Sequence, residues 1–191
     1  MNGLLAALLA VAVESSDDAL LHHPGVFLKH VDLTAASCAE VLGGRPEAGL
    51  TDVHLVATID PPVEGSDGRW TGILHYRLDR ITVELPGRIQ WQGMTDADRA
   101  RAAAYAAAVA HHEAGHVRLA LAFVDELRPV TITAADPDLY FEHATAQRDA
   151  AFVRFRQTQR DYDDLTHHGL RQDRAAGVLR GADTILTCYE R

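Results

Sequence analysis

Positive charge and long apolar runs are both scarce in this chain of 191 residues. The formal net charge is -9 at pH 7, and lysine occurs once, as Lys29, with no cluster of basic residues. Such a chain lacks the positive surface to which phosphate backbones and anionic lipids are attracted. Its longest apolar run covers residues 4–13, whereas a helix needs about 20 residues to span a bilayer. We therefore expect no nucleic acid and no membrane insertion among its partners.

Cysteine is equally scarce, with Cys38 and Cys188 as the only two. One pair is compatible with a disulfide that joins the early part of the domain to its tail, or with two reduced, buried thiols. The N-terminal segment, residues 1–25, also has two interpretations. Its apolar run fits the core of a signal peptide, and it also fits an ordinary buried helix. The sequence is thus compatible with a secreted or periplasmic location and with a cytoplasmic one.

Residues 26–191 are enough for a single domain, since domains usually have roughly 100 to 200 residues. In the front half, alternating apolar and polar residues predict four short strands, at 26–31, 53–59, 73–78 and 81–85. Thr34 is a candidate N-cap for a helix that runs to about residue 42. We therefore expect a small antiparallel sheet with one helix.

The back half is typical of two long helices. Thr95 and Asp98 resemble a capping box with Asp in place of Glu, and no proline follows until Pro129, so a helix is predicted at about 96–128. Asp136 followed by Pro137 is an N-cap followed by a proline in the first helical position, which predicts a second helix at about 137–161. A shorter last helix is expected at about 170–179. The predicted fold class is α+β, with the two long helices packed together.

The pattern H-E-x-x-H, formed by His112, Glu113 and His116, lies inside the first long helix. At positions i and i+4, the two imidazoles project from one helical face about one turn apart, so both can bind one zinc ion. Glu113 projects beside them toward a water molecule that the zinc would activate. Since His112 and His116 also lie in the middle of the apolar stripe, they are expected to face the core.

A catalytic zinc site needs a third protein ligand and an open position. The segment 162–169 offers candidates, because it brings a tyrosine, acids and two histidines to one helix end, and the antiparallel second helix returns that end to the first. His168 is the preferred third ligand and His167 the fallback. Glu142, His143 and Asp163 are rival ligands.

These residues carry a resemblance to a known family. The H-E-x-x-H helix is followed about fifty residues later by a segment of the form Y-D-x-x-T-x-H-G, here Tyr162, Asp163, Thr166, His168 and Gly169, with Gln172 as a looser match. This order resembles the bacterial zincin-like family known as domain of unknown function nine-twenty-two, whose members are regarded as secreted zinc-dependent proteases. The resemblance implies a metallopeptidase-like zinc site with His168 as the third ligand.

The chemistry that such a site supports is hydrolysis of peptide bonds in a peptide or protein substrate. Zinc would polarise the scissile carbonyl, and Glu113 would act as general base and pass the proton to the leaving amine. Tyr162 is a candidate catalytic residue, as a hydrogen-bond donor to the oxyanion. Asp163 is a candidate acceptor for the free N–H of a ligand histidine, which would fix the tautomer of that ring.

A second hypothesis is a non-catalytic module that binds another protein, with or without a metal ion that stabilises its scaffold. The small size of the chain favours this alternative, because little of it is left to form a substrate cleft. Glu113 favours the enzyme, since a closed structural zinc site has no use for a carboxylate beside its ligands.

Overall fold

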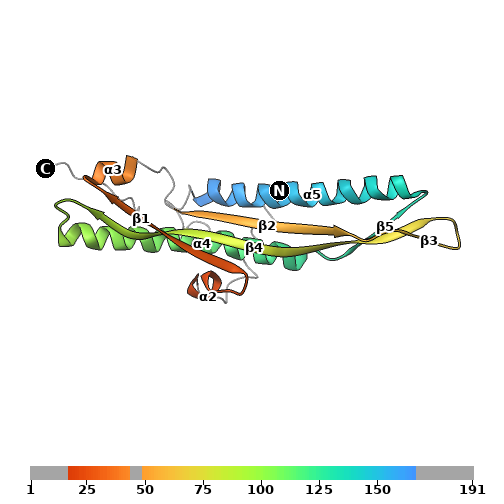
Figure 1. Ribbon diagram of the computed structural model, residues 1–191, viewed down its shortest axis with the longest axis horizontal. Helices are drawn as coiled ribbons and strands as arrows, with labels where there is room; N and C mark the ends of the chain where they lie inside the picture. The colour runs from red at the N-terminus through yellow and green to blue at the C-terminus, as the bar shows by residue number, and fades with distance from the viewer. Residues whose placement is uncertain (1–16, 44–48, 167–191) are drawn as a thin grey trace.

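The computed structural model of the protein describes residues 17–43 and 49–166. In chain order, the elements are α2 (Asp17–Leu21), β1 (Val26–Ala35), α3 (Cys38–Gly43), β2 (Leu50–Ile59), β3 (Val63–Glu64), β4 (Trp70–Trp91), α4 (Asp96–Glu126), β5 (Val130–Ala134) and α5 (Pro137–Thr166). They form an elongated molecule in which α4 and α5 run along a narrow sheet (Figure 1). The α+β class and the two long helices are as predicted.

Strand β4 is the centre of the sheet, because the other four strands all pair with it. Strands β2, β3 and β5 pair with β4 in the antiparallel direction, whereas β1 pairs with it in parallel. The sheet is therefore mixed and differs in this one pairing from the antiparallel sheet that local patterns predict. Alternation along β1 indicates a strand but contains no information on the direction of its neighbour.

The two strands predicted at 73–78 and 81–85 are parts of one strand of 22 residues. A β-bulge separates them, because His54 pairs with Arg80 and the next residue, Leu55, pairs with Leu78. The extra residue, Asp79, accepts hydrogen bonds from Arg77 and His54. Since a bulge adds one residue, it keeps the apolar residues before and after it on the same face of the sheet despite their change of parity.

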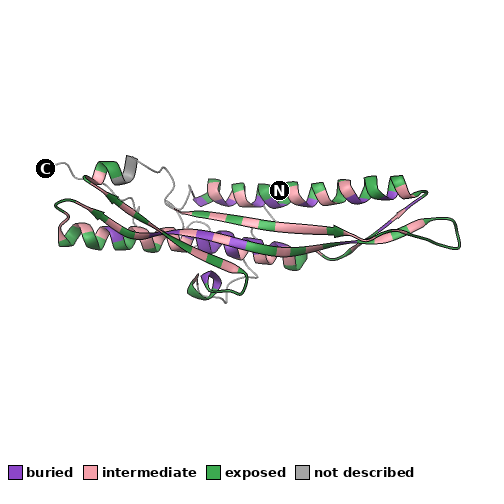
Figure 2. Ribbon diagram, viewed as in Figure 1, coloured by how far each residue is buried: buried purple, intermediate pink, exposed green. Residues whose placement is uncertain are grey.

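The apolar face of the sheet is covered by the long helices. Ile81, Val83 and Leu85 of β4 pack in one core cluster with α4 residues such as Val117 and Phe123. Leu74, on the other side of the bulge, packs with Tyr140 and Ala144 of α5 in a second cluster. Buried residues gather on the middle of α4, on the adjacent part of β4 and along one side of α5 (Figure 2).

The connection through β5 turns the chain back, so α5 runs antiparallel to α4. This direction is visible in successive contacts, which join Phe123 to Phe155 and His116 to Gln159. The expected cap of α5 is confirmed, because the backbone N–H of Leu139 donates to the carboxylate of Asp136 at 2.9 Å. Helix α5 extends to Thr166, five residues beyond its predicted end at 161, and the last helix predicted at 170–179 lies outside the described residues.

The N-terminal elements differ modestly from expectation. Strand β1 continues to Ala35, past the candidate cap Thr34, and the first helix after it begins at Cys38. Cys38 is disulfide-bonded, while Cys188 lies outside the described residues. Helix α2 belongs to the segment 1–25 and buries Leu20 and Leu21 in the cluster of α4.

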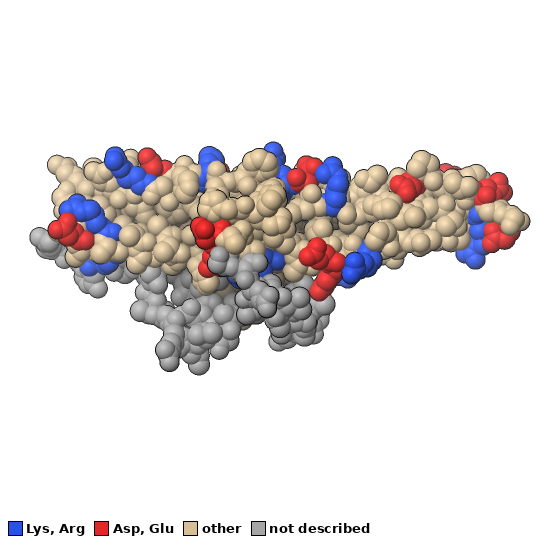
Figure 3. All heavy atoms as spheres, turned by 90° about the horizontal axis from the view of Figure 1, so that it is seen from below, with Lys and Arg blue, Asp and Glu red and all other residues tan. Residues whose placement is uncertain are grey.

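Charged side chains on the face shown in Figure 3 are interspersed, without a large patch of either sign. Among the charged residues of the described segments, Arg77 forms an ion pair with Asp79, and Arg99 forms one with Asp96. Among the described helices, none is long and apolar enough to cross a membrane.

The capping box at the start of α4 is confirmed. The Thr95 hydroxyl accepts from the backbone N–H of Asp98 at 3.2 Å, and the Asp98 carboxylate accepts from the Thr95 backbone at 2.9 Å. Hydrogen bonds from the side chain and backbone of Thr95 lower the pKa of Asp98 from its ordinary 3.8 to about 2. The charged form of Asp98 is thus the form that the folded protein favours.

We predict that Thr95→Ala lowers the free energy of unfolding by about 1 kcal/mol. For Asp98→Asn, the loss of stability is full above the unfolded pKa near 3.8 and disappears as the pH falls through the folded pKa of about 2, since the wild-type carboxyl is then protonated as well. Urea unfolding at several pH values measures both effects. Asp96→Asn, in the same turn, is the control, and an equal pH dependence in this control would contradict the prediction.

Candidate metal centre

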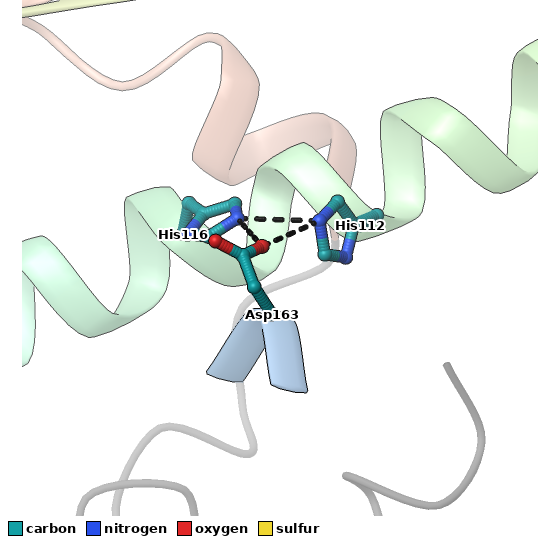
Figure 4. A group of neighbouring side chains, drawn as sticks. All are labelled: His112, His116 and Asp163. Carbon is teal, nitrogen blue, oxygen red and sulfur yellow. Dashed lines mark hydrogen bonds and ion pairs between the residues drawn. The ribbon is translucent and has the colours of Figure 1, made fainter. Parts of the chain in front are cut away.

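Three side chains from the two long helices converge on one point (Figure 4). His112 and His116 project from adjacent turns of α4, as their spacing predicts, and Asp163 projects toward them from α5. The Nε2 atoms of the two histidines are 3.2 Å apart. The Oδ1 atom of Asp163 is 2.9 Å from Nε2 of His116 and 3.2 Å from Nε2 of His112.

This group could hold a metal ion. Ligand atoms on a tetrahedral zinc ion lie about 3.3 Å apart, given bonds of about 2.0 to 2.1 Å. The three distances between the donor atoms, 2.9 to 3.2 Å, are close to that value. The donor chemistry also fits, since two imidazole nitrogens and a carboxylate oxygen are common ligands of divalent transition metals.

The outer nitrogen of each histidine has a partner on α5. Nδ1 of His116 lies 2.6 Å from Oε1 of Gln159, and Nδ1 of His112 lies 3.4 Å from the hydroxyl of Thr166. The amide oxygen of Gln159 can only accept, so His116 carries its proton on Nδ1 and presents the lone pair of Nε2 to the centre. Metal-binding histidines usually have such a partner, which fixes the tautomer and the ring orientation.

One face of α5 supplies all these contacts. Gln159, Tyr162, Asp163 and Thr166 follow the spacing i, i+3, i+4 and i+7, which places them on the same side of a helix. Because α5 is antiparallel to α4, Gln159 meets His116, while Thr166 meets His112. Asp163 lies between these two contacts and reaches both rings.

Tyr162 packs against both imidazoles and contacts the backbone of the same turn. Its hydroxyl donates to the backbone carbonyl of His112 at 3.3 Å. Its ring stacks on His112 at 5.1 Å and meets His116 edge-on at 4.9 Å. Gly115 makes this approach possible, because a Cβ at that position would collide with the phenol. The contacts of Tyr162 therefore position the histidine-bearing turn.

Glu113 is almost fully buried, with 4% of its surface exposed, and is outside the three-residue group. Its Oε2 atom accepts a hydrogen bond of 2.6 Å from the hydroxyl of Thr51, at the start of β2. Burial raises the pKa of Glu113, and the hydrogen bond from Thr51 opposes that rise without cancelling it. A carboxyl with a raised pKa exchanges protons more readily near neutral pH than an ordinary glutamate does.

Without a metal ion, the group is held together as an ion pair. Burial alone would raise the pKa of Asp163, but hydrogen bonds with His112 and His116 hold it well below its usual range. Burial alone would lower the pKa of His116, but the adjacent Asp163 raises it above its usual value. A proton on His116 and a metal cation are thus alternative partners for one half-buried carboxylate.

The structure brings together five of the residues that the sequence singles out, namely His112, Glu113, His116, Tyr162 and Asp163. The expected role of Asp163, as acceptor for an outer N–H of a histidine, is taken by Gln159 and Thr166. The preferred third ligand His168 and the fallback His167 lie outside the described residues. Glu142 and His143 are exposed and do not belong to the group.

Sequence reasoning overlooked the roles of three residues, Thr51, Gln159 and Thr166. Gln159 follows the helical spacing of Tyr162 and Thr166, but glutamine in a sequence gives no specific signal of a histidine partner. The contact of Thr51 joins residues that are 62 positions apart, so no local spacing could reveal it.

The family described as "Bacterial protein of unknown function (DUF922)" matches residues 42–169, which is more than half of the chain. The chain belongs to this family. The residues that match DUF922 include both long helices and all three residues of the candidate centre. No curated protein and no solved structure is significantly similar to this chain.

We predict that Gln159→Leu weakens zinc binding by about 10- to 100-fold, the usual effect of losing the partner of a ligand histidine. Competition with a chromophoric chelator measures the zinc dissociation constant. The control is Gln157→Leu, an exposed glutamine on the same helix. Equal affinities in the two variants would contradict the role of Gln159.

We predict that the wild type purified without chelators carries zinc and that Asp163→Ala loses most of it, because two imidazoles alone bind zinc weakly. Elemental analysis of the folded proteins measures this. Asp164→Ala removes the exposed neighbour and should retain its zinc. His168→Ala, analysed beside them, tests the ligand expected from the sequence. Full zinc content in Asp163→Ala would exclude Asp163 as a required ligand.

Proposed function

We propose that this DUF922 chain is a zinc-dependent metallopeptidase that hydrolyses peptide bonds. His112, His116 and Asp163 would hold the zinc ion, and Glu113 would act as general base. The observation that carries the proposal is the buried carboxylate of Glu113, which lies next to the donor group and outside it. A site that only stabilises the fold would gain nothing from burying a further carboxylate there.

A zinc ion bound there would polarise a scissile carbonyl and acidify a water molecule. Glu113 would take the proton from the attacking water and pass it to the leaving amine, a transfer that its raised pKa favours. Gln159 and Thr166 would hold the two imidazoles in the orientation that presents Nε2 to the metal. Tyr162 would fix the turn of α4 from which both histidines project.

The alternative is a module in which a closed metal site, or no metal, stabilises a protein-binding scaffold. The two hypotheses differ in whether a coordination position is open. A small hydroxamate that chelates an open zinc ion should raise the melting temperature of the zinc-loaded protein, because it binds only the folded state. No shift at saturating hydroxamate would favour the alternative.

We predict that the zinc-loaded wild type cleaves members of a mixture of quenched fluorescent peptides, and that Glu113→Gln slows cleavage by about 100-fold or more, the effect expected for a lost general base. The variant should still bind zinc, because Glu113 is not part of the donor group. Glu126→Gln, at the exposed end of the same helix, is the control. Equal cleavage by Glu113→Gln and the wild type would exclude Glu113 as the base.

A further inference from the structure

We propose that Thr51 is a positioning residue for Glu113, and that the start of β2 sets where the carboxylate of the general base lies. This inference deepens the proposed function and rests on it for the catalytic part. The hydroxyl of Thr51 donates a hydrogen bond of 2.6 Å to Oε2 of Glu113, which is outside the group of three donor residues. Thr51 would therefore act on the base without acting on the metal.

Strand β2 is a rigid support for this contact. Thr51 pairs with Val83, a fully buried residue of the central strand β4. Because side chains alternate along a strand, Thr51 points to the face covered by α4, whereas its neighbours Leu50 and Asp52 are exposed. The hydroxyl of Thr51, on the strand next to β4, thus meets the carboxylate of Glu113 in the buried middle of α4.

Gly49 completes the arrangement from the other side of the carboxylate. A Cβ at position 49 would collide with Oε1 of Glu113, and it would lie 2.9 Å from Cδ and 2.6 Å from Cγ1 of Val109. A glycine is thus required for the carboxylate to occupy this place. Thr51 donates to one oxygen, and the other oxygen packs against the backbone of Gly49.

The division between the two oxygens suits proton transfer. An oxygen that accepts from a fixed hydroxyl cannot swing away, and the second oxygen keeps its lone pairs for the proton of a water molecule. Without the Thr51 hydroxyl, the carboxylate of Glu113 would be free to rotate about its Cγ–Cδ bond and to turn toward His112 and His116. The result would be a base that is present but poorly aligned.

The test uses the full chain with Thr51→Val, which keeps the shape and removes the hydroxyl, and Thr51→Ser, which keeps the hydroxyl. Thr58→Val is the matched control, since Thr58 is an exposed threonine on the same strand. We expect Thr51→Val to lower kcat on a cleaved peptide by about 10- to 100-fold, the range for lost outer partners at metal sites. KM and zinc affinity should change less than about twofold, and Thr51→Ser should retain most of the activity.

A second readout does not require turnover. The side-chain carboxyl carbon of Glu113 gives an NMR resonance in protein labelled on glutamate, and its loss in Glu113→Gln assigns it. We expect this resonance to shift in Thr51→Val and to stay near its wild-type position in Thr51→Ser and Thr58→Val. If the zinc-loaded wild type cleaves no peptide, the proposed function fails, but the resonance still decides whether Thr51 holds Glu113.

Two results would overturn the inference. One is a carboxyl resonance in Thr51→Val that matches the wild type, and the other is a kcat in Thr51→Val that matches Thr58→Val. Gly49→Ala gives an independent check, because it keeps the Thr51 hydroxyl and adds a methyl group against the carboxylate. A shifted Glu113 resonance in this variant, with the melting temperature retained, would support the arrangement, and an unchanged resonance would count against it.

Discussion

The contact between one carboxylate of α5 and two buried imidazoles of α4 determines how the rest of the molecule is organised. His112 and His116 lie in a helical turn that is buried on all sides, because every residue from His112 to Val117 is buried. Polar rings in such a place need partners, and Asp163 provides one for both. This requirement fixes the relative position of the two long helices. It explains why Gly115 leaves room for Tyr162 and why the partners of both rings come from a single face of α5.

The sheet packs against both long helices, and the β-bulge in β4 makes this packing possible. The bulge at Asp79 keeps Leu74 and Ile81 on the same face, so one long strand can carry α5 at one end and α4 at the other. Helix α2 adds a cover on another side of α4, where Asp17 accepts from His111 and from Arg118. These two residues are seven positions apart and therefore on one helical face, on either side of the histidine pair. The turn that bears the histidines is thus enclosed by the sheet, by α2 and by α5.

The sequence predicted the parts of this structure that depend on local spacing. The shared face of His112 and His116, the capping box at Thr95 and the start of α5 at Pro137 all follow from residues within one or two helical turns. The parts that it predicted poorly depend on distant contacts. The parallel direction of β1 and the bulge at Asp79 arise from pairing with β4, and strand alternation does not encode either. The approach of Asp163 to both rings also depends on the register between α4 and α5, which helical periodicity does not encode.

The charges of the three donor residues determine how much positive charge a bound metal ion would keep. Two imidazoles that keep their Nδ1 protons are neutral ligands, so Asp163 is the only anion among the three donors. Their partners Gln159 and Thr166 are also neutral, and they orient the rings without adding negative charge. A divalent cation in this set would keep part of its positive charge, which is the property that polarises a carbonyl, whereas a site rich in thiolates would neutralise it. The carboxyl group of Glu113 lies nearby but outside the donor set, and it accepts a hydrogen bond from Thr51. The partners of these α4 side chains therefore come from two different elements, β2 for Glu113 and α5 for the two imidazoles.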